Sequence, residues 1–208
     1  MDFKDKIEYY VSSTDGYTDA EAQQYIVDGC YDVYRKYKSI KGFDEAQKFG
    51  VMTSNDTTGN APNIDEIHEI LSVQRNGIPA TKVTPSLMHK YTDVDSIHYA
   101  SANDPIFFIE EEYLYHKPVH SGSAALRYIY LPAYAVTTYD GTSSIDKFPA
   151  EYYDHTLLYA SIKILEAKMH NYIEDEEDSE LAQLTGQRID RLKVQYNEMF
   201  GVQQQQWN

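Results

Sequence analysis

Residues 18–42, TDAEAQQYIVDGCYDVYRKYKSIKG, carry the clearest structural signal in the chain. Thr18 and Glu21 have the spacing of a capping box, in which each side chain accepts a hydrogen bond from the backbone N–H of the other residue. Apolar residues then recur at steps of four, four, three, four and three: Ala22, Ile26, Cys30, Val33, Tyr37 and Ile40. This spacing places them on one face of a helix. The stretch therefore predicts a helix of about twenty residues that ends at Gly42.

Both ends of the chain are predicted to be helical. Residues 2–12 form a shorter candidate helix, and residues 148–200 predict two more. Pro149 suits the first position of a helix, where a backbone N–H is not needed. The acidic run Glu174–Asp178 separates the last two helices, and Gly201 ends the second of them. The apolar positions of that last helix recur at steps of three, four and three: Ile189, Leu192, Tyr196 and Met199.

The middle of the chain has the pattern of short β-strands. Residues 50–63 are rich in Ser, Thr, Asn and Gly and predict a polar loop. Branched and aromatic residues follow in short runs separated by turn signals. The predicted strands are 67–73 and 78–83 on either side of Asn76-Gly77, then 105–109, 113–115 and 126–131. The last two flank a turn at His120–Ser123 and predict an antiparallel hairpin, which Pro132 closes because proline has no N–H for the ladder.

These patterns predict an α+β protein with a single domain over residues 1–208. Helical segments at 1–49 and 148–200 form a bundle from both chain ends, and an antiparallel β-rich insertion occupies about 64–147. Residues 201–208 form a flexible tail of polar, low-complexity sequence. A chain of 208 residues with 42% hydrophobic and 25% charged residues can bury a substantial core.

The charge balance excludes several classes of partner. The net charge is −15, from 33 acidic and 18 basic residues. So negative a surface repels phosphate, which argues against sequence-specific nucleic-acid binding but suits a wall past which DNA slides. No run of about 18 apolar residues predicts a membrane helix, and the N-terminus lacks the apolar region of a signal peptide. A single cysteine, Cys30, indicates a protein made in a reducing cytoplasm.

Tyrosine is unusually abundant. Twenty of the 208 residues are tyrosine, about three times an ordinary share. A tyrosine side chain has an apolar ring and a polar tip, so it suits both wet surfaces and buried contacts. Two interpretations remain open: tyrosine replaces phenylalanine in a small, half-exposed core, or it lines contact surfaces between subunits.

The residues give no sign of catalytic chemistry. None of the histidines has the i, i+4 partner and glutamate of a zinc hydrolase: His68, His89, His98, His116, His120, His155 and His170. The acids at Glu174–Asp178 are consecutive and lack the central glycine of a calcium loop. The sequence contains no nucleophile-elbow, P-loop or dinucleotide-binding motif, and Cys30 lies on a buried helix face. We therefore predict no catalytic residue, metal ligand or cofactor, and no enzyme.

A resemblance to a known family rests mainly on the C-terminal half. The strand Leu126–Pro132 leads through a polar loop to Ile145–Pro149, and a helix through Tyr159-Ala160-Ser161 is followed by the acidic junction Glu174–Asp178. This order resembles the neck proteins of tailed bacteriophages, the head-to-tail connector or adaptor rings that dock beneath the portal. The segment Tyr25–Val33 is likewise similar to the first long helix of such virion proteins.

The resemblance implies a structural role in the virion. Members of that family assemble as rings of about twelve copies around the DNA channel. The expected partners are further copies of this chain, the portal protein and the next neck or tail protein, without a membrane. The expected location is the virion neck, after synthesis in the host cytoplasm.

The C-terminal segment is the expected docking element. Phe200, Val202 and Trp207 could become ordered on meeting the portal, with Trp207 as a buried anchor. An ordinary frayed terminus explains the same residues equally well. Two alternatives to the adaptor remain: another virion subunit of the tail tube, baseplate or capsid, and a cytoplasmic hydrolase or ligand-binding module with its pocket between sheet and helices.

Overall fold

The computed structural model confirms an α+β fold with helices contributed by both chain ends. It describes residues 2–12, 16–65, 67–119, 124–174 and 179–201. The described residues divide into two compact units. The helical unit contains residues up to Lys48 and from Tyr134 onward, and the β unit contains Phe49–Ala133.

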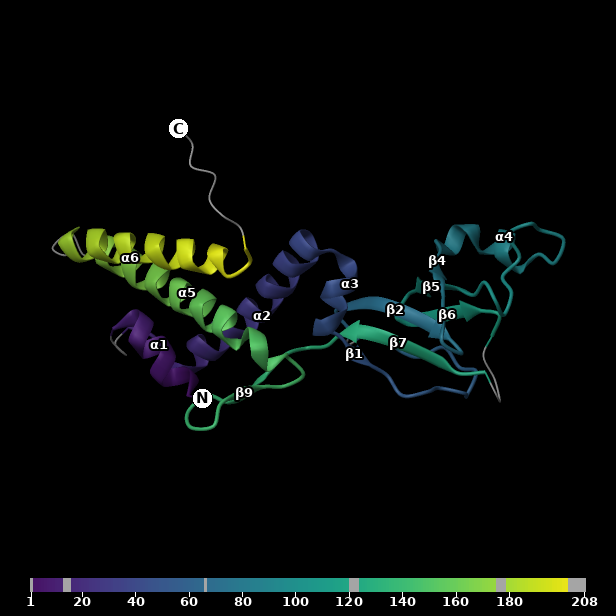
Figure 1. Ribbon diagram of the computed structural model, residues 1–208, viewed down its shortest axis with the longest axis horizontal. Coiled ribbons are helices and arrows are strands. Elements are labelled where there is room, and N and C mark those ends of the chain that lie inside the picture. The colour runs from purple at the N-terminus through teal and green to yellow at the C-terminus, as the bar shows by residue number, and fades with distance from the viewer. Residues whose placement is uncertain (1, 13–15, 66, 120–123, 175–178, 202–208) are drawn as a thin grey trace, which may run out of the picture. The chain divides into compact units, whose positions relative to one another are not determined.

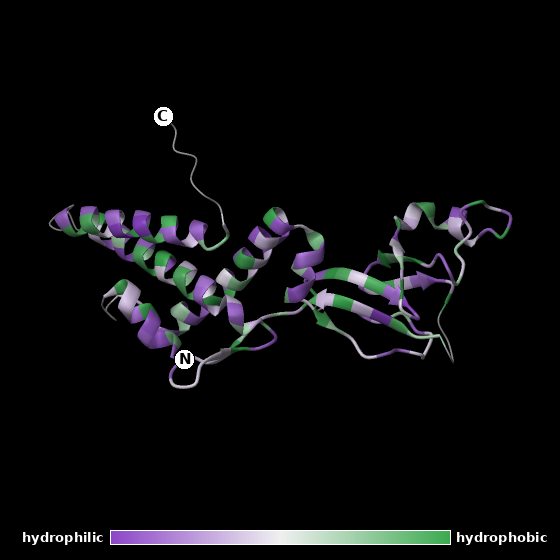
Figure 2. Cartoon of the chain, in the orientation of Figure 1, coloured by the Kyte–Doolittle hydropathy of each residue, from purple (hydrophilic) through white to green (hydrophobic). Residues whose placement is uncertain are grey.

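The helical unit is organised around α5, which packs against α1, α2 and α6. Figure 1 shows α6 running back alongside α5. Hydrophilic and hydrophobic residues alternate along α6, as expected for a helix with one buried face (Figure 2). The elements of this unit are α1 (Phe3–Val11), α2 (Asp19–Lys41), α3 (Phe43–Ala46), η1 (Gln47–Phe49, whose last residue begins the β unit), β8 (Val136–Thr138), β9 (Ser144–Ile145), η3 (Ala150–Tyr152), α5 (Tyr153–Glu174) and α6 (Ser179–Glu198).

The predicted ends of α2 are confirmed. The Glu21 backbone N–H donates to Thr18 Oγ1 over 3.2 Å, and the Thr18 N–H donates to Glu21 Oε2 over 2.7 Å. These two bonds form the capping box and satisfy N–H groups that have no partner inside the helix. Gly42 follows the last turn with φ +90°, a conformation that favours glycine.

Four of the six residues on the predicted apolar face of α2 are buried, and Tyr37 is half-buried. The buried members are Ala22, Ile26, Cys30 and Val33. Ile40, the last residue of the row, is exposed. Gly29 lies beside this row, where a Cβ atom would be 3.0 Å from the Thr156 carbonyl oxygen and 3.2 Å from Tyr159 Cδ1. The absence of a side chain at Gly29 therefore lets α2 approach the backbone of α5 closely.

Residues 134–147 belong with the helices, whereas the sequence assigned them to the β-rich insertion. The Tyr134 ring packs 5.2 Å from Tyr31 on α2 and 5.1 Å from Phe148, measured between ring centres. The Phe3 backbone N–H at the start of α1 donates to Ser143 Oγ over 3.0 Å. The short pair β8–β9 is therefore held by aromatic and polar contacts to residues distant in the sequence, which strand propensity does not reveal.

The β unit contains two small sheets. The first has the order β1-β7-β2-β3 and is antiparallel, and the second has the order β4-β5-β6, in which β4 and β5 are parallel. The elements are β1 (Val51–Met52), β2 (Glu69–Arg75), β3 (Ile78–Pro79), β4 (Thr81–Lys82), η2 (Pro85–Leu87), α4 (Met88–Thr92), β5 (Ile106–Glu110), β6 (Tyr113–Lys117) and β7 (Leu126–Leu131). The predicted turn at Asn76-Gly77 joins β2 to β3, with φ of 50° and 79° at its two residues.

The predicted hairpin between 113–115 and 126–131 is wrong. Strand β6 pairs with β5, and β7 pairs with β1 and β2 in the other sheet. The β5–β6 turn passes through Glu111 at φ +53°, a position without the Asn-Gly or Asp-Gly signal of a tight turn. The glycine-containing segment His120–Ser123, which suggested the hairpin, lies outside the described residues.

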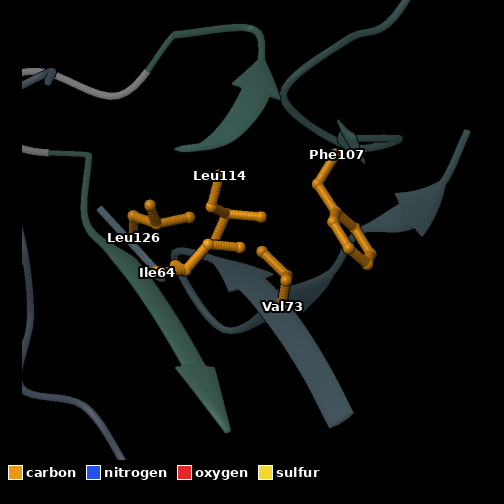
Figure 3. Close-up of a cluster of buried hydrophobic side chains, with 5 residues drawn as sticks. All are labelled: Ile64, Val73, Phe107, Leu114 and Leu126. Atoms are coloured by element: carbon orange, nitrogen blue, oxygen red, sulfur yellow. The ribbon is translucent and has the colours of Figure 1, made fainter. Parts of the chain in front are cut away.

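The core of the β unit joins the two sheets. Val73 of β2 and Leu126 of β7 meet Phe107 of β5 and Leu114 of β6, and Ile64 fills the space between them (Figure 3). The Ile64 backbone N–H donates to the Glu112 carbonyl over 2.8 Å, which holds this loop residue beside β6. Gly50, read from the sequence as part of a polar loop, instead sits against Leu71 and Ile129.

Candidate interaction surfaces

A groove on the helical unit lies between α1 and α6. Its wall on α6 comes from residues at steps of four, three and four: Leu184, Arg188, Arg191 and Gln195. That spacing forms one helix face, adjacent to the buried row that contains Leu192. The opposite wall comes from the last turn of α1, with Glu8, Tyr9 and Tyr10. The volume is about 1040 Å³, and we call this feature the α1–α6 groove.

Arg188 fixes the two walls of the α1–α6 groove relative to each other. Its guanidinium donates to Ser12 Oγ and, over 3.1 Å, to the Tyr9 carbonyl oxygen. The last carbonyls of a helix carry a partial negative charge, so a cation is favourable there. Arg191, the neighbouring cation on the same face of α6, is exposed and has no ion pair with the described residues.

Two large apolar side chains are exposed among the polar residues that line the α1–α6 groove. Tyr9 is 79% exposed and Leu184 is 55% exposed. Both lie off the buried rows of their helices, which are Phe3, Ile7 and Val11 on α1 and Ile189, Leu192 and Tyr196 on α6. From the sequence, an apolar row was identified only on the last of these two helices, and the groove was missed. Leu184, an apolar residue among the polar residues on the groove face of α6, is the sequence signal that could have indicated the groove.

A second surface lies on the β unit, in the turn that follows α4. Val94 is 72% exposed and Ile97 is 95% exposed, the highest value among the large apolar side chains described. We call residues 93–97 the 93–97 turn. Single exposed apolar residues are common on proteins, whereas two branched ones in one short turn make the turn a candidate contact surface. Nothing in the sequence pattern marked this turn.

The backbone of the 93–97 turn is held by its own polar groups. The Asp95 N–H donates to Asp93 Oδ1, and the Ser96 N–H donates to the Asp93 carbonyl, each over 3.1 Å. The His98 N–H then donates to Ser96 Oγ over 3.1 Å. Because these bonds define the turn, Val94 and Ile97 are presented without the entropic cost of ordering a flexible loop on binding.

Phe200, one of the three predicted docking residues, is buried. Its exposed fraction is 4%, and its ring centre lies 5.1 Å from His155, 5.3 Å from Tyr37 and 5.1 Å from Tyr196. In this structure Phe200 therefore anchors the end of α6 to α2 and α5 and does not present a side chain to a partner. The other two predicted docking residues, Val202 and Trp207, lie outside the described residues.

His155 is the polar member of this aromatic cluster. It is buried, and neither ring nitrogen makes a hydrogen bond of good geometry to the described residues. Burial lowers the pKa of His155, and the nearby Met199 carbonyl and the Asp154 charge only partly offset this. Tyr152 packs on the same imidazole, and burial together with the neighbouring Glu151 raises the pKa of Tyr152 to about 12. The cluster thus holds a neutral imidazole among aromatic rings.

The remaining candidates for reactive or metal-binding groups are Cys30 and the other histidines. Cys30 is fully buried, and burial raises the pKa of its thiol, which makes it a poor nucleophile. His116 is also buried, whereas His120 falls outside the described ranges. Within those ranges no group of three or more His, Cys, Asp or Glu could hold a metal ion. No helix there is long and apolar enough to cross a membrane.

Comparison with known proteins adds no family. The chain matches no protein-family model, and no curated protein is significantly similar to it.

Proposed function

We propose that this protein is a structural subunit of a tailed bacteriophage, an adaptor in the neck that joins the portal to the next neck or tail protein. The class comes from the sequence resemblance described above. A helical unit from both chain ends, with the β unit inserted between them in the sequence, agrees with the architecture that the resemblance implies.

The observation that carries the proposal is the exposure of apolar side chains on both units. Tyr9 and Leu184 rim the α1–α6 groove, and Val94 and Ile97 lie on the 93–97 turn. Burial of one large apolar side chain is worth about 1.5–3 kcal/mol. Patches of this kind are typical of protein contact sites. A subunit surrounded by other chains would bury them.

The charge of the chain is compatible with a DNA channel. A net charge of −15 repels phosphate, so DNA could pass such a wall without binding to it. Adaptor function requires passage of the genome, whereas a basic channel would retain it. In this role the protein acts mechanically, by joining neighbouring proteins and keeping the channel open.

The test uses the purified full-length protein, alone and mixed with a portal protein from the genome that encodes it. Light scattering after size exclusion measures the mass, and negative-stain microscopy shows the shape. We expect rings, either alone or seated on the portal. A protein that stays monomeric and fails to bind the portal at tens of micromolar would contradict the proposal. Rings that bind only a tail-tube, baseplate or capsid subunit would favour another virion role.

A further inference from the structure

We propose that the 93–97 turn of one copy docks in the α1–α6 groove of the next copy. The groove is thus assigned one occupant, a second copy of this chain. The inference deepens the proposed function and rests on it, because an adaptor ring is what brings copies together. It names the surfaces through which they meet.

The two surfaces match in apolar character. The turn presents Val94 and Ile97, 72% and 95% exposed, on a backbone held by Asp93 and Ser96. The groove offers Leu184 and Tyr9 at its rim, and at about 1040 Å³ it has room for two branched side chains. Because both surfaces are already formed, little conformational entropy is lost when they meet.

The two surfaces also match in charge. Asp93 and Asp95 flank Val94 in the turn, whereas the groove contains Arg188 and Arg191 against the single carboxylate of Glu8. Copies of a chain with a net charge of −15 repel one another, so self-contact requires a locally basic face. The α1–α6 groove is such a face, and opposite charges across an interface favour the correct register.

The contact joins different surfaces of the two copies. Each copy offers one turn, on its β unit, and one groove, on its helical unit. A contact between unlike patches is heterologous, and it produces a ring when the rotation closes and a filament when it does not. The proposed docking can therefore repeat from copy to copy and form a ring when the rotation closes, whereas a contact between like patches would stop at a dimer.

Disulfide cross-linking tests the contact. Ile97→Cys and Leu184→Cys are made in separate full-length chains, mixed in equal amounts with the portal present, and oxidised mildly. Cys30 can remain because it is fully buried. We expect a cross-linked dimer from the mixture, and a ladder of oligomers from a chain that carries both substitutions. The control pair is Met52→Cys with Ile173→Cys, which are exposed on the same two units but lie outside the turn and the groove.

Absence of a 97–184 cross-link in assembled rings would overturn the docking. So would a cross-link confined within single chains, because the groove would then receive its own turn. Circular dichroism of each variant confirms that the fold is retained, as expected for exposed side chains.

A charge exchange provides an independent test. Asp95→Lys and Arg191→Glu each place like charges across the contact, and we expect each to weaken self-association about tenfold. The chain that carries both changes should recover most of the loss, because the pair is opposite in charge again. If the double variant instead loses as much self-association as the two single variants together, the docking is overturned. Glu110→Lys, at an exposed position on β5, is the matched control.

The outcomes separate this inference from the proposed function. Rings on the portal without the 97–184 cross-link would remove the docking and leave the adaptor role. A 97–184 cross-link in a protein that does not bind the portal would support the docking and contradict the adaptor role. If Ile97→Asp abolishes portal binding but leaves self-association unchanged, the turn binds the portal and the docking is overturned.

Discussion

The Tyr196 hydroxyl donates a 2.6 Å hydrogen bond to Asp32 Oδ2 and thereby ties the end of α6 to α2. Lys36 lies 3.7 Å from the same carboxylate oxygen and 3.9 Å from the centre of the Tyr196 ring. Burial and the Asp32 carboxylate raise the pKa of Tyr196, so its hydroxyl remains a donor. This junction orients α6, whose other face forms one wall of the α1–α6 groove.

Removal of this bond should destabilise the helical unit. Tyr196→Phe keeps the ring but leaves the partly buried Asp32 without its donor, at a cost of about 1–2 kcal/mol. We expect a lower urea midpoint with an unchanged slope. Tyr9→Phe, which alters an exposed ring on the same unit, should leave the midpoint within experimental error. Equal effects of the two substitutions would show that the Asp32 bond contributes nothing.

Two helical glycines should respond in opposite directions to alanine. At Gly186 a Cβ atom would meet only Met169 Sδ at 3.6 Å, so Gly186→Ala should raise stability by about 0.5–1 kcal/mol through helix propensity. At Gly29 a Cβ atom would lie 3.0 Å from the Thr156 carbonyl oxygen, and the backbone of α5 cannot easily move away. Gly29→Ala should therefore lower stability, by about 1–3 kcal/mol. Thermal unfolding measures both, and stabilisation by Gly29→Ala would contradict the close packing of α2 on α5.

Gly50 should be equally sensitive in the β unit. A Cβ atom there would lie 2.5 Å from Ile129 Cγ2 and 2.9 Å from Leu71 Cδ1. Ile129 is β-branched and stiff, so Gly50→Ala must shift β7 and should cost about 1–3 kcal/mol. Hydrogen exchange should become faster in β7 and its partner β2, whereas Ser54→Ala at a nearby exposed position should leave both unchanged.

The stability of the helical unit should fall in mild acid because of His155. A histidine whose folded pKa lies below its unfolded value of about 6.5 binds fewer protons in the folded state. The stability that depends on neutral His155 is fully present above about pH 6.5 and is lost as the pH falls through that value towards the folded pKa.

Denaturation at pH 7.5 and pH 5.5 measures this effect. His155→Phe keeps an aromatic ring beside Phe200 and Tyr37 but cannot accept a proton, so the difference between the two pH values should shrink. His170→Gln, at an exposed position on the same helix, should keep the difference seen in the unaltered protein. A pH dependence that survives in His155→Phe would assign it to other groups.

The features predicted correctly from the sequence are local ones. The capping box of Thr18 and Glu21, the stop at Gly42 and the turn at Asn76-Gly77 each involve residues a few positions apart. The buried row on α6 is also local, because helix geometry places residues three and four apart on one side. These signals were sufficient to predict the helices at both chain ends and the α+β class.

The pairing of most strands could not be predicted from the sequence. Residues 126–131 and 113–115 were correctly predicted as strands, but they were paired with each other. In the structure β7 pairs with β1 and β2, and β6 pairs with β5. Residues 134–147 join the helical unit through Tyr134 and Ser143, which meet α2 and α1. Except for β5 and β6, which a short turn joins, these partners are separated by dozens of residues, and strand propensity contains no information about them.

The interaction surfaces also depend on tertiary packing. Phe200 looked available for docking because it stands near a chain end, yet Tyr37, His155 and Tyr196 enclose it. Leu184 and Ile97 are ordinary apolar residues in the sequence, yet packing leaves them exposed. Hydrogen bonds within helices and turns follow from neighbouring residues, so the sequence determines those elements directly. Which side chains end up buried or exposed is settled only when distant segments pack, because burial is a property of the whole fold.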